Sequence, residues 1–172
     1  MKKLTIRKNK RRPRWSFEFL PTLIRKNKDY KITKYIGFTD SAIYQFNDDD
    51  QHDVNKLFGF SFGWHHNNSV RFGWRPNEDL TKIEIVGYEY INKLRVSTIP
   101  IHEVELNWVY RYELKYNSEF NMIEYKISDG DSQFSTMHPI TLKKEYNWGY
   151  KLGLYFGGNK KAPHNMDFYI QN

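Results

Sequence analysis

Apolar and polar positions alternate most clearly between Leu57 and Arg75, where the period is two residues. Two aromatic-rich runs, at 58–64 and 70–74, fall on one side of an extended chain. The alternate positions are mostly small or cationic; they are Gly59, Ser61, Gly63, His65, Ser69, Arg71, Gly73 and Arg75. The pattern predicts a β-hairpin with one aromatic face in the core and one polar face rich in glycine and arginine.

The turn of this hairpin is predicted at residues 66–68, because the two Asn residues there tolerate positive φ. A three-residue turn pairs His65 with Ser69 and Gly63 with Arg71. This register keeps the aromatic residues together, whereas a shift by one residue would mix them with arginine. Repeated glycine on the other face indicates either a ligand groove or a chain segment that covers the face.

A second segment, 148–158, repeats the alternation. Its apolar face is predicted to hold Tyr150, Leu152, Leu154 and Phe156, and its other face Lys151, Gly153, Tyr155 and Gly157. Further strands are predicted at 4–8, 15–19, 30–38, 42–46, 82–90, 94–97, 98–105, 106–116, 120–127 and 166–171. An acidic loop is expected at 47–53, and one helical turn at 141–146. Many short strands and almost no helix predict an all-β, two-sheet antiparallel β-sandwich of the jelly-roll type.

The charge of the chain is concentrated at its N-terminus. The net charge is +7, and eight cationic residues precede Trp15: Lys2, Lys3, Arg7, Lys8, Lys10, Arg11, Arg12 and Arg14. Subtracting these eight charges from +7 leaves −1 for the remaining residues. We therefore predict a basic N-terminal arm at 1–14 and a single β-sandwich domain at 15–172. Such an arm can bind nucleic acid, although a solvated arm is the simpler interpretation.

Several classes of site and location are excluded or disfavoured. There is no cysteine, so no disulfide or thiolate chemistry is expected. No apolar run suits a membrane span or a secretory signal, which favours a cytoplasmic or virus-encoded protein. A secreted protein whose signal has been removed remains an alternative. The histidines lack the spacing of a metal site, and we expect neither metal nor cofactor. The oligomeric state is not predicted.

Short motifs resemble those of one fold superfamily. Arg71-Phe72-Gly73-Trp74-Arg75 is similar to the R-x-E-L-R motif of alginate-lyase-type polysaccharide lyases, and Lys151-Leu152-Gly153-Leu154-Tyr155 is similar to their K-x-G-x-Y motif. His102 stands where those lyases have the His of Q-x-H. Gly73 and Pro100 replace the Glu and Gln of these motifs. The resemblance implies a concanavalin A-like jelly roll, the fold of many lectins, glucanases and polysaccharide lyases.

If the protein is a lyase that cleaves uronic-acid polymers, the resemblance implies a role for each matching residue. Arg71 and Arg75 would neutralise the substrate carboxylate, and Lys151 would lie nearby. His102 would be the base that removes the C5 proton, and Tyr155 the acid that protonates the leaving oxygen.

The function that we predict from the sequence is recognition of a carbohydrate, possibly an anionic glycan, in a groove between 57–75 and 148–158. The candidate binding residues supply planar donors, cations and an aromatic ring; they are His65, Arg71, Arg75, Lys151, Tyr155, Asn159 and His164. The polysaccharide lyase is the alternative. A binder of a phosphate-bearing nucleotide and a structural or interaction protein are further alternatives.

Overall fold

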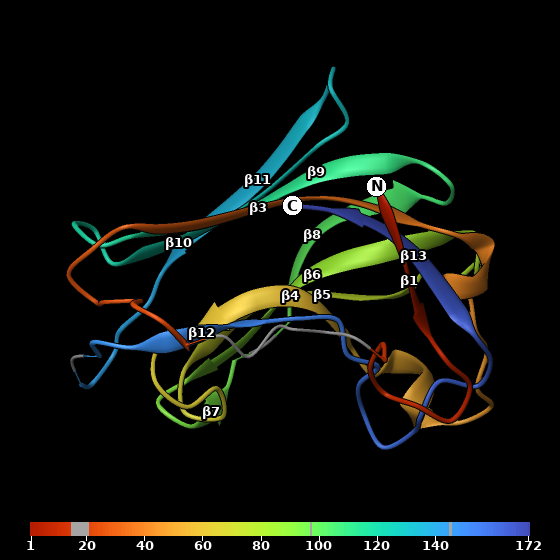
Figure 1. Cartoon of the computed structure of the whole chain (residues 1–172), viewed down its shortest axis with the longest axis horizontal. Coiled ribbons are helices and arrows are strands. Elements are labelled where there is room, and N and C mark those ends of the chain that lie inside the picture. Colours follow the sequence, from red (N-terminus) through yellow and green to blue (C-terminus); the bar gives the residue numbers. More distant parts are fainter. Residues whose placement is uncertain (15–20, 97, 145) are drawn as a thin grey trace.

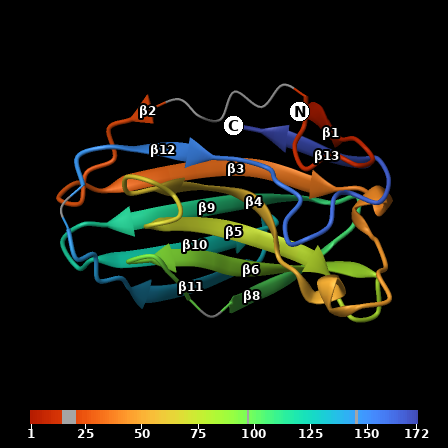
Figure 2. The same cartoon turned by 90° about the horizontal axis from the view of Figure 1, so that it is seen from below.

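The computed structural model of the chain describes residues 1–14, 21–96, 98–144 and 146–172. Within these residues, antiparallel strands form two sheets that face each other across an apolar core (Figure 1). The strands of both sheets run along the long axis of the molecule (Figure 2). The predicted all-β, two-sheet antiparallel sandwich is therefore confirmed.

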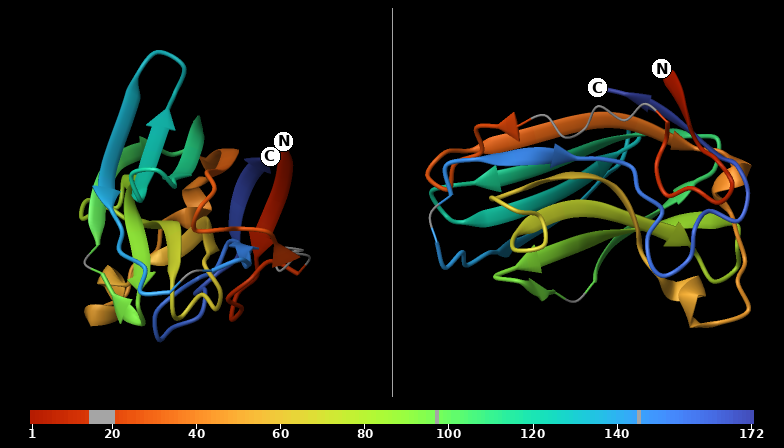
Figure 3. Two further views of the ribbon diagram at one scale, coloured as in Figure 1. Left: turned by 90° about the vertical axis from the view of Figure 1, so that its left-hand side faces the viewer. Right: turned by 60° about the horizontal axis from the view of Figure 1, so that its bottom comes forward.

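One sheet has six strands in the spatial order β1–β13–β3–β9–β10–β11. In chain order they are β1 (Lys2–Ile6), β3 (Tyr30–Phe38), β9 (Val109–Asn117), β10 (Met122–Ser128), β11 (Gln133–Pro139) and β13 (Met166–Gln171). β1 and β13 lie side by side at one edge, near both ends of the chain (Figure 3).

The other sheet has seven strands. Five follow one another across it: β2 (Pro21–Thr22), β12 (Gly149–Leu152), β4 (Asn55–Ser61), β5 (Ser69–Pro76) and β6 (Lys82–Ile91). Both β7 (Leu94–Arg95) and β8 (Ile99–Glu105) pair with β6. Two short 3₁₀ helices, η1 (Asp40–Ala42) and η2 (Asp49–His52), lie between β3 and β4.

Aromatic side chains from both sheets fill the core. Phe72 of β5 contacts Tyr112 and Tyr125 of the opposite sheet edge-on, with ring centroids 5.4 and 5.0 Å apart. Trp74 meets Phe168 edge-on and Phe38 at a tilt, with ring centroids 5.4 Å apart in each case. Burying one such side chain stabilises the fold by about 1.5–3 kcal/mol. The aromatic face of the 57–75 segment thus joins the two sheets, as its alternation predicted.

The register predicted for the 57–75 hairpin is wrong by four residues. Arg71 lies opposite Gly59 rather than Gly63, and the connection is a loop over residues 62–68. Two backbone N–H groups in this loop, those of Asn67 and Asn68, donate to the carbonyl of Trp64. A shift by an even number of residues preserves the two faces, so Arg71 still lies opposite the core. Trp64, predicted to be buried, is exposed.

The face prediction for 148–158 is correct in its second half only. Leu154 and Phe156 join the core. Leu152 instead lies opposite Gly59, on the outer face of the sheet, and Tyr150 shares that face. The change occurs because the strand ends at Leu152 and the chain returns to β4 only through Tyr155.

The N-terminal segment differs from the predicted arm. Residues 2–6 pair along their whole length with β13, and Ile6 is fully buried. The strand predicted at 42–46 does not form: Ala42 is the last residue of η1, and residues 43–46 are irregular. β11 was not predicted, and the described part of 141–146 has no helical turn. The strand predicted at 15–19 lies outside the described residues. No helix within the described part of the chain is long and apolar enough to cross a membrane.

Candidate functional site

The outer face of the seven-stranded sheet carries a groove of about 260 Å³ around Arg71. Residues from four regions of the chain line it; they are Arg12, Lys56, His65, His66, Arg71, Tyr88, Tyr90, Tyr155 and Gly158. None of these lining residues is acidic. The groove therefore combines positive charge with phenol rings.

Arg71 projects from the middle of β5 into the floor of this groove. Strand pairing places it beside Gly59 of β4 and Tyr88 of β6. Only 8% of the residue is exposed, and its Nε has no hydrogen-bond partner among the described residues. Burial lowers the pKa of Arg71 to about 10, so the guanidinium remains charged at neutral pH. A buried cation with an unused donor favours an anionic ligand.

Lys56 provides a second cation on the same face. A β-bulge at the next residue, Leu57, turns Lys56 toward Gly73 and the groove. Its Nζ donates to the Val54 carbonyl at 2.9 Å and lies 4.5 Å from the centre of the Tyr88 ring. Burial, and then the charges of Arg71 and Arg95, lower the pKa of Lys56 to about 8.

His65 and Tyr150 form a hydrogen-bonded pair beside Arg71. The Tyr150 hydroxyl accepts the backbone N–H of His65 at 3.2 Å and is also hydrogen-bonded to Nδ1 of its ring. Burial, and then the charge of Arg71, lower the pKa of His65 to about 4. The imidazole is therefore neutral at pH 7. With the hydroxyl proton donated to Nδ1, the ring proton lies on Nε2.

Tyr88, Tyr90 and Tyr155 complete the lining of the groove. Burial raises the pKa of Tyr88 to about 12, so its hydroxyl stays protonated. Tyr155 is held beside Lys56 by two backbone hydrogen bonds of 2.8 Å. These rings offer both apolar faces and hydroxyl groups to a ligand.

Three of the sequence-predicted site residues meet in the groove: His65, Arg71 and Tyr155. Arg75 does not, although it is on the same strand. Its Nε donates to Glu84 at 2.5 Å, and Nη1 donates to the His52 carbonyl at 2.9 Å. It lines a separate cavity, whose lining includes four acidic residues. The sequence placed Arg75 on the correct face, but only the structure shows that a carboxylate already pairs with it.

The other predicted residues also lie elsewhere. Lys151 lies opposite Phe60 and so on the other side of the sheet from Arg71. His164 donates from Nε2 to the Ser41 carbonyl at 2.9 Å. His102 stacks on Phe134 with ring centroids 3.5 Å apart, and its strand partner Ile85 is a core residue. His102 therefore does not line the groove that holds Tyr155, and the structure does not bring this predicted pair together.

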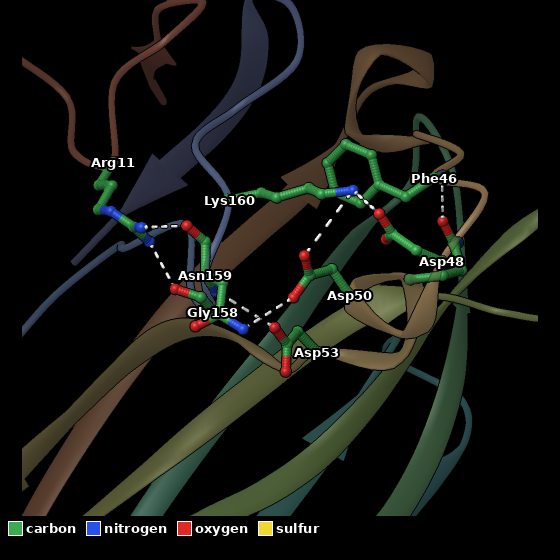
Figure 4. A network of polar contacts seen from close by, with 9 residues as sticks. Arg11, Phe46, Asp48, Asp50, Asp53, Gly158, Asn159 and Lys160 are labelled. Atoms are coloured by element: carbon green, nitrogen blue, oxygen red, sulfur yellow. Dashed lines mark hydrogen bonds and ion pairs between the residues drawn. The ribbon is translucent and has the colours of Figure 1, made fainter.

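Asn159 belongs to a polar network next to the groove (Figure 4). Its side chain donates to Asp50 at 3.1 Å, and Arg11 donates to the carbonyls of Gly158 and Asn159 at 2.8 Å each. Lys160 pairs with Asp48 and lies 3.7 Å from Asp50. The acidic loop expected at 47–53 thus anchors the segment that carries Gly158, and Asn159 has a structural partner.

Sequence reasoning missed several lining residues, among them Lys56, Tyr88 and Tyr90, and it missed Tyr150 as the partner of His65. Tyr88 and Tyr90 alternate along β6, so the register of β5 and β6 could have placed them beside Arg71 and Ser69. Lys56 gave no signal, because simple alternation groups it with the core side chains and only the bulge reverses it. Across the described residues, no group of three His, Cys, Asp or Glu side chains is arranged to hold a metal ion.

Comparison with known proteins places the fold. No family model matches the sequence. No curated protein matches it either. Among solved structures, the alginate lyase vAL-1 from Chlorella virus aligns with a TM-score of 0.53 and 14% identity, covering 99% of this chain and 81% of that chain.

Winged bean acidic lectin, solved in complex with methyl-α-D-galactose, aligns with a TM-score of 0.53 and 16% identity, covering 99% of this chain and 87% of that chain. The chain therefore has the concanavalin A-like jelly-roll fold that the motifs predicted. At these identities the likeness concerns the fold alone, and the function must be argued from the site.

Proposed function

We propose that the protein binds an anionic glycan through the groove around Arg71. The observation that carries this proposal is a buried, unneutralised guanidinium beside a second cation, Lys56, in a groove whose lining has no acidic residue. A carboxylate-bearing sugar would supply the missing acceptor for Arg71, and the tyrosine rings would contact its apolar ring faces. The lectin solved with methyl-α-D-galactose and the alginate lyase, which share the fold, support this choice of ligand class.

The test compares two arginines of one strand that lie on the same face. Arg71→Gln and Arg75→Gln are titrated with mannuronate and guluronate oligomers by calorimetry. Arg71→Gln should weaken binding about ten- to hundred-fold, because it removes a charge-assisted hydrogen bond worth about 1.5–3 kcal/mol. Arg75→Gln should bind like the wild type, because Glu84 already neutralises Arg75.

Thermal unfolding of both variants is the control for folding. Equal loss of affinity in both variants would contradict the assignment of the site to Arg71. If the protein binds a nucleoside triphosphate and none of the uronate oligomers, the nucleotide alternative is favoured. Neutral oligosaccharides that bind as tightly as uronates would remove the anionic part of the proposal.

The His65–Tyr150 pair favours a second candidate function, a polysaccharide lyase. In β-elimination, a base removes the C5 proton, the C4–O bond breaks, and the leaving oxygen takes up a proton as the C4=C5 bond forms. Because Nδ1 of neutral His65 can accept the Tyr150 hydroxyl proton, Tyr150 would remove the C5 proton as it passes its own proton to His65, and would then give a proton to the leaving oxygen; Arg71 would neutralise the carboxylate. They replace the His102 and Tyr155 pair suggested by the sequence.

Elimination leaves an unsaturated uronide that absorbs ultraviolet light. If the protein is a lyase, absorbance should rise with polymannuronate or polyguluronate, and Tyr150→Phe should lower the rate by about a hundred-fold or more. Tyr155→Phe is the comparison variant, since Tyr155 also lines the groove, whereas the hydrogen bond to the His65 ring comes from Tyr150. If the protein binds these polymers but the absorbance does not rise, lyase activity on them is rejected, and glycan binding without cleavage remains as the proposed function.

A further inference from the structure

Two exposed tryptophans lie directly beside the groove and take no part in the function proposed above. Trp64 is 66% exposed and Trp148 is 42% exposed. Their indole rings meet edge to face with centroids 5.4 Å apart. Exposed indoles in contact are costly in water and are typical of surfaces that bind a ligand.

The position of both tryptophans is set by the backbone. The Gly63 N–H donates to the Trp148 carbonyl at 2.8 Å, which joins the hairpin loop to the start of β12. Gly63 has φ of 68°, a conformation that favours glycine, and the loop turns there immediately before Trp64. Because these constraints involve backbone atoms, removing either indole leaves them in place.

A row of aromatic rings in contact connects the tryptophans to the groove. Trp148 stacks on Tyr150 at 6.3 Å with an interplanar angle of 19°, and Tyr150 meets His65 edge-on at 5.8 Å. His65 packs on His66 at 4.1 Å, and His66 meets Tyr90 of the groove at 5.9 Å. The aromatic rings are therefore in continuous contact from Trp64 to the lining around Arg71.

From this continuity we propose that Trp64 and Trp148 form a second subsite, which stacks on a sugar ring of the glycan whose carboxylate-bearing unit occupies the Arg71 groove. This inference rests on the proposed function and specifies its ligand as a chain of several sugars. An indole offers a flat apolar face to the C–H groups of a pyranose ring. The cations bind one charged unit, and the tryptophans bind a neighbouring unit through its ring face.

The experiment measures affinity against chain length, using mannuronate and guluronate oligomers of one to six units. The wild type should bind long oligomers more tightly than short ones. Trp64→Ala with Trp148→Ala should weaken binding of the longest oligomers about ten-fold and leave that of the shortest unchanged, since one stacked aromatic contact corresponds to a few-fold in affinity. Trp108→Ala is the matched control, because Trp108 is 57% exposed and lies in the β8–β9 turn.

Tryptophan fluorescence gives a second readout. Long oligomers should quench the emission of the wild type and of Trp108→Ala but not of the double variant. Trp64→Tyr with Trp148→Tyr keeps flat rings and should recover most of the affinity. Equal affinities of the wild type and the folded double variant for every length would overturn the second subsite and leave the Arg71 groove intact. Failure of the wild type to bind any oligomer would overturn both proposals.

Discussion

At the scale of single residues, the glycines of the polar face serve chain packing. A Cβ at Gly59 would overlap the Val70 carbonyl oxygen, and one at Gly73 would collide with Val54. The sequence left open whether this face is covered or forms a groove. Chain atoms fill the space beside the glycines, and the groove remains only where Arg71 and its neighbours line it.

Lys56 makes ligand binding dependent on pH. Its pKa of about 8 means that its charge is present at pH 7 and mostly absent at pH 9. The affinity for a uronate oligomer should therefore fall as the pH rises from 7 to 9. His65, Tyr88 and Arg71, whose pKa values are about 4, 12 and 10, stay mainly in one protonation state over this range.

Calorimetric titrations at several pH values check this prediction, with Lys56→Gln as the control. The variant should bind more weakly than the wild type at pH 7, and its affinity should change little between pH 7 and 9. If the affinity of Lys56→Gln changed with pH as much as that of the wild type, Lys56 would be excluded as the cause.

The same pKa shift of Lys56 affects the stability of the fold with the opposite sign. The unfolded chain holds the Lys56 proton more tightly, so this lysine should increase the free energy of unfolding as the pH rises from about 8 to 10.5.

At the scale of elements, β1 shows how the start of the basic N-terminal segment is built into the fold. The sequence predicted both a basic segment and a strand at 4–8, and the backbone of residues 2–6 completes the six-stranded sheet. Asp167 of β13 accepts a hydrogen bond from Thr5 at 2.6 Å and pairs with Lys3 at 2.9 Å. The charge of the segment was visible in the sequence, whereas its pairing partner lies at the other end of the chain.

A core substitution in β1 distinguishes a strand from an arm. Ile6→Ala should lower the free energy of unfolding by about 2–4 kcal/mol, because Ile6 is fully buried in the core. Lys2→Ala, at the exposed start of the same strand, should change it by less than about 0.5 kcal/mol. Chemical denaturation of both variants measures the difference. Equal stability of the two variants would mean that residues 2–6 contribute little to the sandwich.

The imperfect alternation of 82–91 also has an explanation at this scale. Glu89 of β6 lies on the core face opposite Val70 and is only 1% exposed. It accepts a hydrogen bond from the Tyr125 hydroxyl at 2.8 Å and lies 2.9 Å from Nε2 of His138. These partners come from β10 and β11 of the other sheet. A buried carboxylate is tolerated there because two groups across the core bind it.

At the scale of the whole molecule, the sandwich distributes the positive charge that the sequence concentrates at one end. Lys3 lies at the sheet edge, Arg11 joins the 158–160 segment, and Arg12 lies 5.1 Å from the centre of the Tyr155 ring. One part of the predicted arm thus contributes to the groove itself. Nucleic-acid binding by this segment, the cellular location and the absence of a cofactor remain predictions.

The sequence by itself determined the fold class and the two faces of the central hairpin. Side-chain alternation is a local property, and it survives a register error of four residues because the period of a strand is two. It therefore placed Arg71 and His65 opposite the core. The resemblance of short motifs to lyases also led to the correct fold.

Only the tertiary structure decided which of these side chains meet. The bulge that turns Lys56 outward, the carboxylate that neutralises Arg75 and the stacking of His102 on Phe134 each depend on a partner distant in the sequence or on a local irregularity. Loop 62–68 and β12 bring His65 to Tyr150, and Trp64 to Trp148, across more than eighty residues. Local periodicity specifies the face of a strand, whereas a binding site requires the long-range register that only packing of the two sheets establishes.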